Sequence, residues 1–296
     1  MIKYFYSILC ALIAYSSIAQ PKIENALLWK IEDPAQKVAP SYLFGTIHLI
    51  GKKDFVLKEE VTNALNQCKN IVFEVNMEDM TDMSKMMNLM MQANMAGDTT
   101  LQDLLSQQDY AMVSNYFEKE GIPLVMFERM KPMFITTMVM GTMSGGDSKE
   151  EMMSYEMELM NYAKDKKLKM DGLESFEYQM GIFDIIPYKV QAKMLVDGIQ
   201  SGKDTTQVNQ LQQLVDLYKK QDLSKLQELM QADTEGLGVY TKLLLDDRNT
   251  NWVPKIKAKI KESTFFAVGA GHLAGKTGVI TLLREAGLKV TPIQQL

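Results

Sequence analysis

The chain has 296 residues, of which 46% are hydrophobic and 23% are charged, and its formal net charge is −5. This length allows one large domain or two small ones. The mild acidity argues against nucleic acid as a partner, because phosphate binding needs a clustered positive field.

The first residues have the pattern of an export signal. Lys3 supplies a positive charge, residues 4–15 are apolar, and small residues end the segment at Ala19. The apolar stretch is shorter than the roughly 20 residues that span a bilayer. We predict a signal peptide over residues 1–19, export to the periplasm or the extracellular space of a bacterial envelope, and no membrane span after cleavage. A retained N-terminal anchor is the alternative.

Cleavage of the signal would remove Cys10 and leave Cys68 as the one cysteine of the mature chain. No intramolecular disulfide is then expected, so stability must come from the core. Cys68 follows a helical pattern just before a strand. A small buried hydrophobic residue is the ordinary interpretation there, and a catalytic thiol is the weaker one.

The first part of the mature chain predicts the start of a sheet. We expect strands over residues 26–32, 42–47 and 71–75 and a helix over residues 56–67. A turn at Asp33-Pro34 favours a hairpin of the first two strands. Glu74 interrupts the otherwise apolar third strand, and a carboxylate buried there is costly unless it is paired or ligated.

A helical insertion rich in methionine follows, at about residues 77–166. Its first methionines recur at helical spacing, as Met80, Met83, Met87, Met90 and Met91. Methionine fills irregular apolar surfaces, so core packing or a peptide-binding groove is the favoured interpretation. A store for cuprous ions is the other. Residues 121–123 break the pattern, residues 141–147 predict a loop, and a helix returns over residues 149–166.

Strands and helices alternate again in the last part of the chain. We expect strands over residues 168–173, 264–268 and 288–293, and helices over residues 176–199, 206–219, 223–231, 237–245, 250–260 and 278–286. Strand, glycine turn, helix and strand is the order of an α/β unit. The predicted fold is therefore α/β, with a mixed central sheet built from strands at both ends of the chain and a large helical insertion or cap in the middle. We expect one domain over residues 20–296.

The chain contains two histidines, and both end the same short motif after an apolar run. Gly45, His48, Leu49, Gly51 and Lys52 recur as Gly269, His272, Leu273, Gly275 and Lys276. A glycine three residues before each histidine lets the backbone turn sharply and lets another group approach closely. Because ligand sites in α/β sheets lie at the carboxyl ends of strands, we expect His48 and His272 to share one site.

Acidic side chains and a polar pair complete the predicted site. Glu74 and Glu174 lie at or near strand ends, where four strands could bring them to the two imidazoles. Two imidazoles with carboxylates suit zinc, manganese, cobalt or iron, with an open position for water. The neighbouring pair Arg248-Asn249 lies at a helix junction. Arginine there could bind a substrate carboxylate or stabilise negative charge that develops on a carbonyl.

Each of these residues also has a structural interpretation. Glu74 could form a buried ion pair, and Glu174 could cap the next helix. Asp246 and Asp247 could neutralise Arg248 on a solvated helix. The repeated glycine frame favours function for the histidines, because perturbed polar groups cluster at such crevices.

The two Gly-x-x-His motifs, Phe73-Glu74, Gly172-Leu173-Glu174 and Arg248-Asn249 together resemble the TraB/GumN family. That family includes the pheromone-shutdown proteins of conjugative plasmids and the animal Tiki proteases. The resemblance covers about residues 27–293. It implies an α/β fold assembled from a duplicated unit and, in the Tiki branch, a metal-dependent hydrolytic centre. Carried over by position, the resemblance implies that the metal ligands are His48, Glu74 and His272. It implies supporting roles for Glu174 and Arg248.

Three functions follow from these expectations. The first is an exported metal-dependent hydrolase acting on a peptide or small-molecule substrate, with Glu74 as third ligand or general base and with Glu174, Arg248 and Asn249 in support. The second is a non-catalytic envelope protein that binds or sequesters a peptide or small ligand. The third is a carrier of metal or haem.

Overall fold

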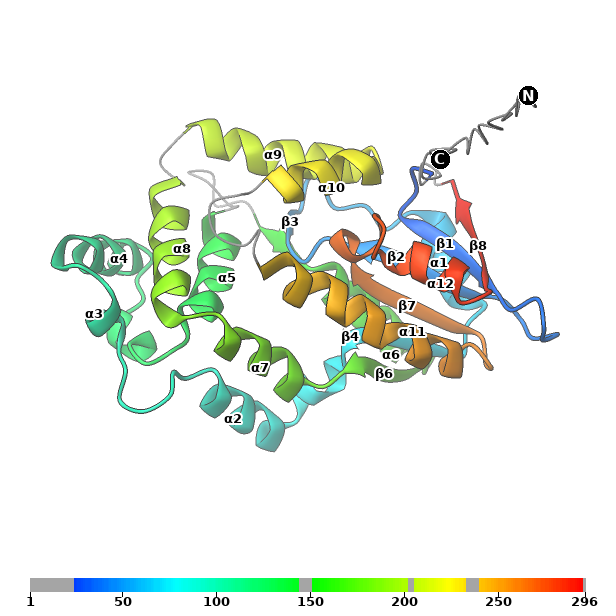
Figure 1. Ribbon diagram of the computed structural model, residues 1–296, viewed down its shortest axis with the longest axis horizontal. Helices are drawn as coiled ribbons and strands as arrows, with labels where there is room; N and C mark the ends of the chain where they lie inside the picture. Colours follow the sequence, from blue (N-terminus) through cyan, green and yellow to red (C-terminus); the bar gives the residue numbers. More distant parts are fainter. Residues whose placement is uncertain (1–23, 144–150, 202–204, 233–239, 295–296) are drawn as a thin grey trace, which may run out of the picture.

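The structure, a computed structural model, describes residues 24–143, 151–201, 205–232 and 240–294 (Figure 1). Its central element is a six-stranded mixed sheet with the order β6-β4-β7-β2-β1-β8. The strands are β1 (Leu28–Glu32), β2 (Ser41–Thr46), β4 (Asn70–Val75), β6 (Lys169–Glu174), β7 (Thr264–Gly269) and β8 (Lys289–Ile293). Strands from both ends of the chain meet in this sheet and helices fill the middle of the sequence, so the predicted fold class is confirmed.

The direction of the strands places four carboxyl ends at one edge of the sheet. β1 pairs antiparallel with β2, as the predicted hairpin requires, and with β8. In contrast, β2, β7, β4 and β6 are parallel neighbours. The paired positions Thr46 with Gly269 and Val75 with Glu174 lie where these strands end. The segments that follow the four strands are therefore brought side by side.

Burial explains why these segments form the interior of the sheet. Every residue of β2 and β7 is buried, and β4 is buried from Ile71 to Val75. Parallel strands that are covered on both faces have such near-continuous apolar runs. In Figure 1, α11 (Asp247–Lys259) and α12 (Val279–Glu285) cross in front of the sheet, and α1 (Glu59–Asn66) and α6 (Tyr155–Lys166) lie behind it. All four helices contribute buried side chains to the core of the sheet.

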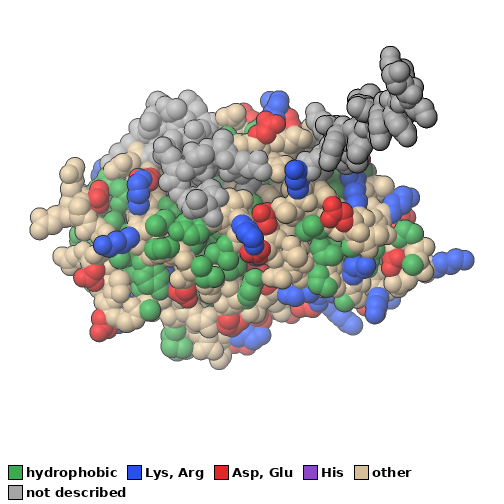
Figure 2. Space-filling view, viewed as in Figure 1, with side chains coloured by type: hydrophobic (Ala, Val, Ile, Leu, Met, Phe, Trp, Pro, Cys, Tyr) green, Lys and Arg blue, Asp and Glu red, His purple; other side chains and the backbone are tan. Residues whose placement is uncertain are grey.

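The remaining helices lie mostly in the other half of the molecule (Figure 1), although the two over residues 205–232 also contribute buried side chains to the core of the sheet. They are η1 (Met77–Thr81), α2 (Met83–Gln92), α3 (Leu101–Leu104), α4 (Gln107–Lys119), η2 (Leu124–Phe127), α5 (Pro132–Met143), α7 (Phe176–Ile185), α8 (Tyr188–Ser201), α9 (Thr205–Lys219) and α10 (Leu223–Ala232). α8 follows β6 in the chain, yet its Leu195, Val196 and Ile199 share one apolar cluster with α3, α4 and α5. The helical layer therefore extends beyond the predicted insertion of residues 77–166. Figure 2 shows hydrophobic side chains gathered mainly over this half on the face that it views.

Three predicted helices have different limits in the structure. The helix expected over residues 149–166 begins at Tyr155, because β5 (Met152–Met153) pairs with β3 (Ile50–Gly51). The helix expected over residues 176–199 is divided into α7 and α8 just before and after Pro187, whose missing N–H interrupts helical bonding. The helix expected over residues 250–260 begins earlier, because the π-helical turn η5 (Lys242–Asp246) runs directly into α11.

The methionine face of α2 is exposed to solvent. Met83, Met87, Met90 and Met91 have 76, 62, 47 and 63% of their surface accessible, whereas Leu89 is the buried residue of this helix. The prediction of core packing is therefore wrong for these four methionines. A peptide-binding surface and a cuprous-ion store stay predictions.

Several predicted features lie outside the described residues: the signal peptide, Cys10, most of the loop over residues 141–147 and the start of the helix over residues 237–245. Residues 141–143 belong to the last turn of α5 and not to a loop. Cys68 is buried as predicted, and burial raises the pKa of its thiol to about 11. Within the described ranges, no helix is long and apolar enough to cross a bilayer.

Candidate active site

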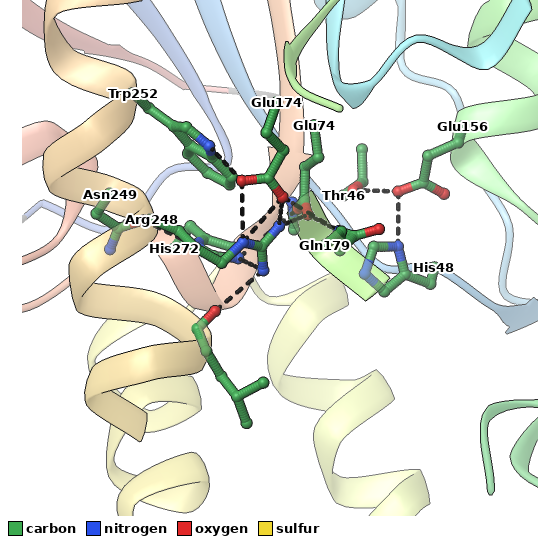
Figure 3. A network of polar contacts seen from close by, with 12 residues as sticks. Thr46, His48, Glu74, Glu156, Glu174, Gln179, Arg248, Asn249, Trp252 and His272 are labelled. Atoms are coloured by element: carbon green, nitrogen blue, oxygen red, sulfur yellow. Dashed lines mark hydrogen bonds and ion pairs between the residues drawn. The ribbon is translucent and has the colours of Figure 1, made fainter. Parts of the chain in front are cut away.

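The carboxyl edge of the four parallel strands carries the polar side chains that the sequence singles out (Figure 3). Glu174 ends β6, and Glu74 is the residue before the last in β4. His48 follows β2, and His272 ends the short helix η6 (Ala270–His272) after β7. The structure thus orders Glu174, Glu74, His272 and His48 across the edge in the same order as their strands in the sheet.

Gly269 is the point on which three of these side chains converge. A Cβ atom at Gly269 would lie 3.3 Å from Oε1 of Glu74, 3.6 Å from Nε2 of His48 and 3.7 Å from Cδ2 of His272. The glycine of the second motif therefore leaves open the space that the two imidazoles and the carboxylate share. Its backbone N–H donates to Oε1 of Glu74 at 2.7 Å and fixes that carboxylate.

We expect Gly269→Ala to weaken binding of Co²⁺ about tenfold or more while the chain stays folded, because the added methyl group enters this shared space. Gly269 has φ −54, which alanine adopts without strain. Cobalt titration and the melting temperature would check this. Gly181→Ala on α7 is the control, since a Cβ there meets nothing within 4 Å. Equal cobalt affinity in both variants would contradict the convergence.

His272 is a neutral imidazole whose two nitrogens have distinct roles. Asn249 Nδ2 donates to the carbonyl of Thr277, so its Oδ1 faces the ring and accepts from Nδ1 of His272 at 2.6 Å. The proton therefore sits on Nδ1, and Nε2 accepts from Nη1 of Arg248 at 3.2 Å. Burial, together with the nearby positive charges, lowers the pKa of His272 to about 3. Nε2 is thus unprotonated at neutral pH, and its lone pair is the acceptor for Arg248.

His48 is held by a carboxylate that the sequence interpretation missed. Glu156, on α6, accepts from Nδ1 of His48 at 2.9 Å and from the hydroxyl of Thr46 at 2.6 Å through the same oxygen. Ser154 donates to the other oxygen at 3.1 Å. The hydrogen bond to Glu156 raises the pKa of His48 to about 9, although the imidazole side chain is 71% exposed. Burial would raise the pKa of Glu156, but its bonds to His48 and Thr46 lower it.

Glu156→Gln is expected to return the pKa of His48 from about 9 toward 6.5, because the amide no longer favours the charged imidazole. In the wild type, the protonated pair stabilises the fold fully below about pH 6.5, and this contribution is lost as the pH rises through 9. NMR titration of the metal-free chain would show the change in the pKa of His48, since His272 does not titrate in this range. Urea denaturation across the same pH range would show the change in stability. An unchanged His48 titration would refute the pairing.

Arg248 joins the two glutamates and His272 in one buried network (Figure 3). Its Nη2 donates to Glu74 at 2.5 Å and to Glu174 at 2.6 Å, and Nε donates to Glu174 at 3.0 Å. Nη1 donates to the carbonyl of Leu244 and to His272. All five N–H donors of the guanidinium are bonded within the protein. Stabilising charge on a substrate would require one of these bonds to break.

The network confirms one structural interpretation and corrects two others. Glu74 forms a buried ion pair with Arg248, as the structural interpretation of this residue predicts. The cap of α7 is the hydroxyl of Ser175 and not Glu174, whose carboxylate accepts from Arg248 and from the indole of Trp252. Arg248 is buried and is not neutralised by its neighbours in sequence: Asp246 accepts from Thr277, and Asp247 pairs with Lys242.

Glu74 is ionised throughout the neutral range. Burial alone would raise its pKa, but the charge that His272 gains in acid, the charges of Arg248 and His48, and the N–H of Gly269 lower it to about 2. A carboxylate of such low pKa is a weak general base. The geometry therefore favours a ligand or electrostatic role for Glu74 over proton abstraction.

The site opens into a cavity of about 210 Å³. His48, Glu74, Glu156, Met77 and Gln179 contribute to its lining, and the amide of Gln179 lies 3.3–3.4 Å from the two glutamates. A larger cavity of about 660 Å³ lies between α2 and α7 and contains neither histidine. The smaller one is therefore the cavity that the candidate site residues line.

The chain is similar to known proteins over most of its length. The sequence model of the TraB/PrgY/gumN family matches residues 27–292. The chain belongs to this family. Metalloprotease TIKI2 of Danio rerio and metalloprotease TIKI2 of Xenopus tropicalis are both 23% identical to it, over 92% of this chain. The chain spans 62% and 61% of the length of these two relatives. No solved structure gives a significant match.

The donor set of this TraB/PrgY/gumN member fits a divalent ion in its chemistry. Two imidazoles and one carboxylate surround Gly269, and each imidazole Nδ1 contacts an oxygen, of Glu156 or of Asn249. Outer-shell oxygens orient metal-ligating histidines in this way. Among the residues that the structure describes, no three histidine, cysteine or acidic side chains are close enough to hold an ion in the present arrangement. Arg248 occupies Nε2 of His272 instead.

Proposed function

We propose that the chain is a metal-dependent hydrolase that acts on peptide bonds. The observation that carries this proposal is the convergence of His48, Glu74 and His272 on the open space at Gly269. The printed names of the two TIKI2 relatives describe metalloproteases, which supports the same class. We also propose that the chain acts after export, on the strength of its predicted signal peptide.

The side chains at the site would have separate roles in this reaction. His48, Glu74 and His272 would hold the ion, which when bound lowers the pKa of a water molecule and polarises the scissile carbonyl. Glu156 and Asn249 keep the two imidazoles oriented toward that space. The amide of Gln179 lines the cavity beside Glu74 and would position the substrate there.

Elemental analysis and a hydrolysis assay of the purified mature chain would test the proposal. The wild type is expected to contain or take up one divalent ion per chain and to release peptides from an unfolded, carboxymethylated protein. The His48→Ala, His272→Ala double variant should lose both properties. A wild type that takes up no stoichiometric metal, and a double variant that behaves identically, would contradict the proposal.

The exposed methionine face of α2 favours a second candidate, a non-catalytic protein that binds a peptide or small ligand. Flexible thioether side chains adapt to varied apolar partners. Here the polar network would orient a ligand without cleaving it. Saturable binding of a labelled apolar peptide, with no cleavage at any metal concentration, would favour this function over hydrolysis.

A further inference from the structure

The guanidinium of Arg248 competes for the same atoms that a divalent ion would use. Neutral His272 has one in-plane lone pair, on Nε2, and it accepts from Nη1 of Arg248 at 3.2 Å. One lone pair serves either a hydrogen-bond donor or a metal ion, and not both. Glu74, the expected carboxylate ligand, likewise has one oxygen bonded to Nη2 of Arg248.

The charges around Arg248 act on a divalent ion in two opposite ways. Glu74 and Glu174 carry two negative charges, and Arg248 supplies one positive charge. The side chains of the three residues are 10, 2 and 8% exposed, so solvent screens them little. His272 is neutral, so these three buried residues keep a net negative charge that attracts a cation, and the protonated imidazole of His48 faces Glu74 in the metal-free chain. A guanidinium bonded to His272 nevertheless opposes an ion at that nitrogen.

Arg248 lies beside an irregular helical turn. Arg248 lies in the first turn of α11, directly after the π-helical turn η5, and its Nη1 also donates to Leu244 within that turn. Isolated π-helical turns occur frequently at functional sites. Conversion of such a turn to α-helix shifts the register by one residue, which would withdraw the guanidinium arm from His272 without unfolding α11.

We propose that Arg248 is a resident competitor for the divalent ion: it holds Nε2 of His272 until an ion displaces it, and it thereby sets the metal affinity and metal choice of the site. This inference rests on the proposed function. It assigns Arg248 a positioning and specificity role in place of a direct contact with substrate.

Titration of chelator-treated full-length mature protein with Co²⁺ tests the inference, read by the visible absorption of the bound ion and not by turnover. Arg248→Gln is expected to bind Co²⁺ about tenfold or more tightly than wild type, because loss of a charge-assisted hydrogen bond has effects of this size. Arg248→Lys keeps the charge but lacks the forked second arm, so its affinity for Co²⁺ should be about threefold or more above that of the wild type. Lys289→Gln in β8, at the opposite edge of the sheet from β6, removes the same charge from an exposed side chain and should change nothing.

The outcomes separate this inference from the proposed function. If neither Arg248 variant binds Co²⁺ more tightly than wild type, the competition is refuted while the hydrolase proposal stands. If no protein binds Co²⁺ through His48 and His272, both fail. Should Arg248→Gln not fold, Arg248→Lys decides alone. A crystal structure of the cobalt-loaded wild type should show Nη1 of Arg248 out of hydrogen-bond reach of His272, and a retained bond at about 3.2 Å would overturn the inference.

Discussion

Replacement of Arg248 by methionine is expected to lower the free energy of unfolding by about 3–5 kcal/mol, because removing one partner of a buried ion pair leaves uncompensated charge. Glu174 would lose its guanidinium partner and keep only the weaker donors of Trp252 and Gln179. Methionine keeps an unbranched apolar stem but loses the guanidinium, whose carbon lies 4.9 Å from the ring centroid of Trp252. Urea denaturation at pH 7 would measure the change.

The control for this variant is Lys242→Met, which removes the same charge from the exposed pair with Asp247. Exposed ion pairs contribute little, so we expect a change within about 1 kcal/mol. The Arg248→Met deficit should also shrink at low pH, where protonated carboxylates no longer need a cation. A loss no larger than that of the control would show that the network is not a stabilising unit.

The strand-end residues of the site could be predicted because their signal is local. A glycine three residues before each histidine marks a strand end in β2 and β7, and Glu74 stands out inside an apolar strand. Parallel strands end at a common edge, so these positions meet without any detailed knowledge of packing. The mixed sheet was predictable for the same reason, since its strands have clear apolar runs.

The partner of Arg248 could not be predicted from its neighbours in sequence. Asp246 and Asp247 are adjacent, but the residues that neutralise Arg248 lie 174 and 74 positions away. Which carboxylate faces α11 depends on the order β6-β4-β7 and on the helix that crosses it, and neither is encoded locally. The capping interpretation of Glu174 failed for a smaller reason, because Ser175 is a better cap and is the next residue.

Glu156 was missed because nothing in its own sequence surroundings marks it as a site residue. Only its contact with His48 does so. It lies 108 residues from His48, in a helix that the sequence assigns to the methionine-rich insertion. The useful clue would have been that a ligating imidazole needs an oxygen at its second nitrogen. The methionines of α2 gave a signal that was read too far. Helical spacing predicts one apolar face for α2, but it does not say whether that face points inward.

Glu74→Gln is expected to reduce hydrolysis of the carboxymethylated protein by about 100-fold or more, because loss of even an outer-shell partner of a metal ligand reduces metal affinity or activity by about 10–100-fold. The amide has nearly the shape of the carboxylate and keeps an oxygen for the N–H of Gly269, but it lacks the charge that would hold the ion. Folding should survive, since Glu174 still pairs with Arg248. Kinetics of peptide release, with bound metal measured in parallel, would check the loss.

The same variant should change how stability depends on pH. Because the pKa of Glu74 is lowered from 4.5 to about 2, its ionised form stabilises the wild type above pH 4.5, and this contribution is lost as the pH falls through 2. Glu74→Gln should flatten the stability profile in that window. Glu177→Gln removes the same charge from α7 outside the network and should keep both turnover and profile. Full turnover in Glu74→Gln would mean that the strand glutamate serves the buried ion pair alone, and the site would then have to work through its histidines.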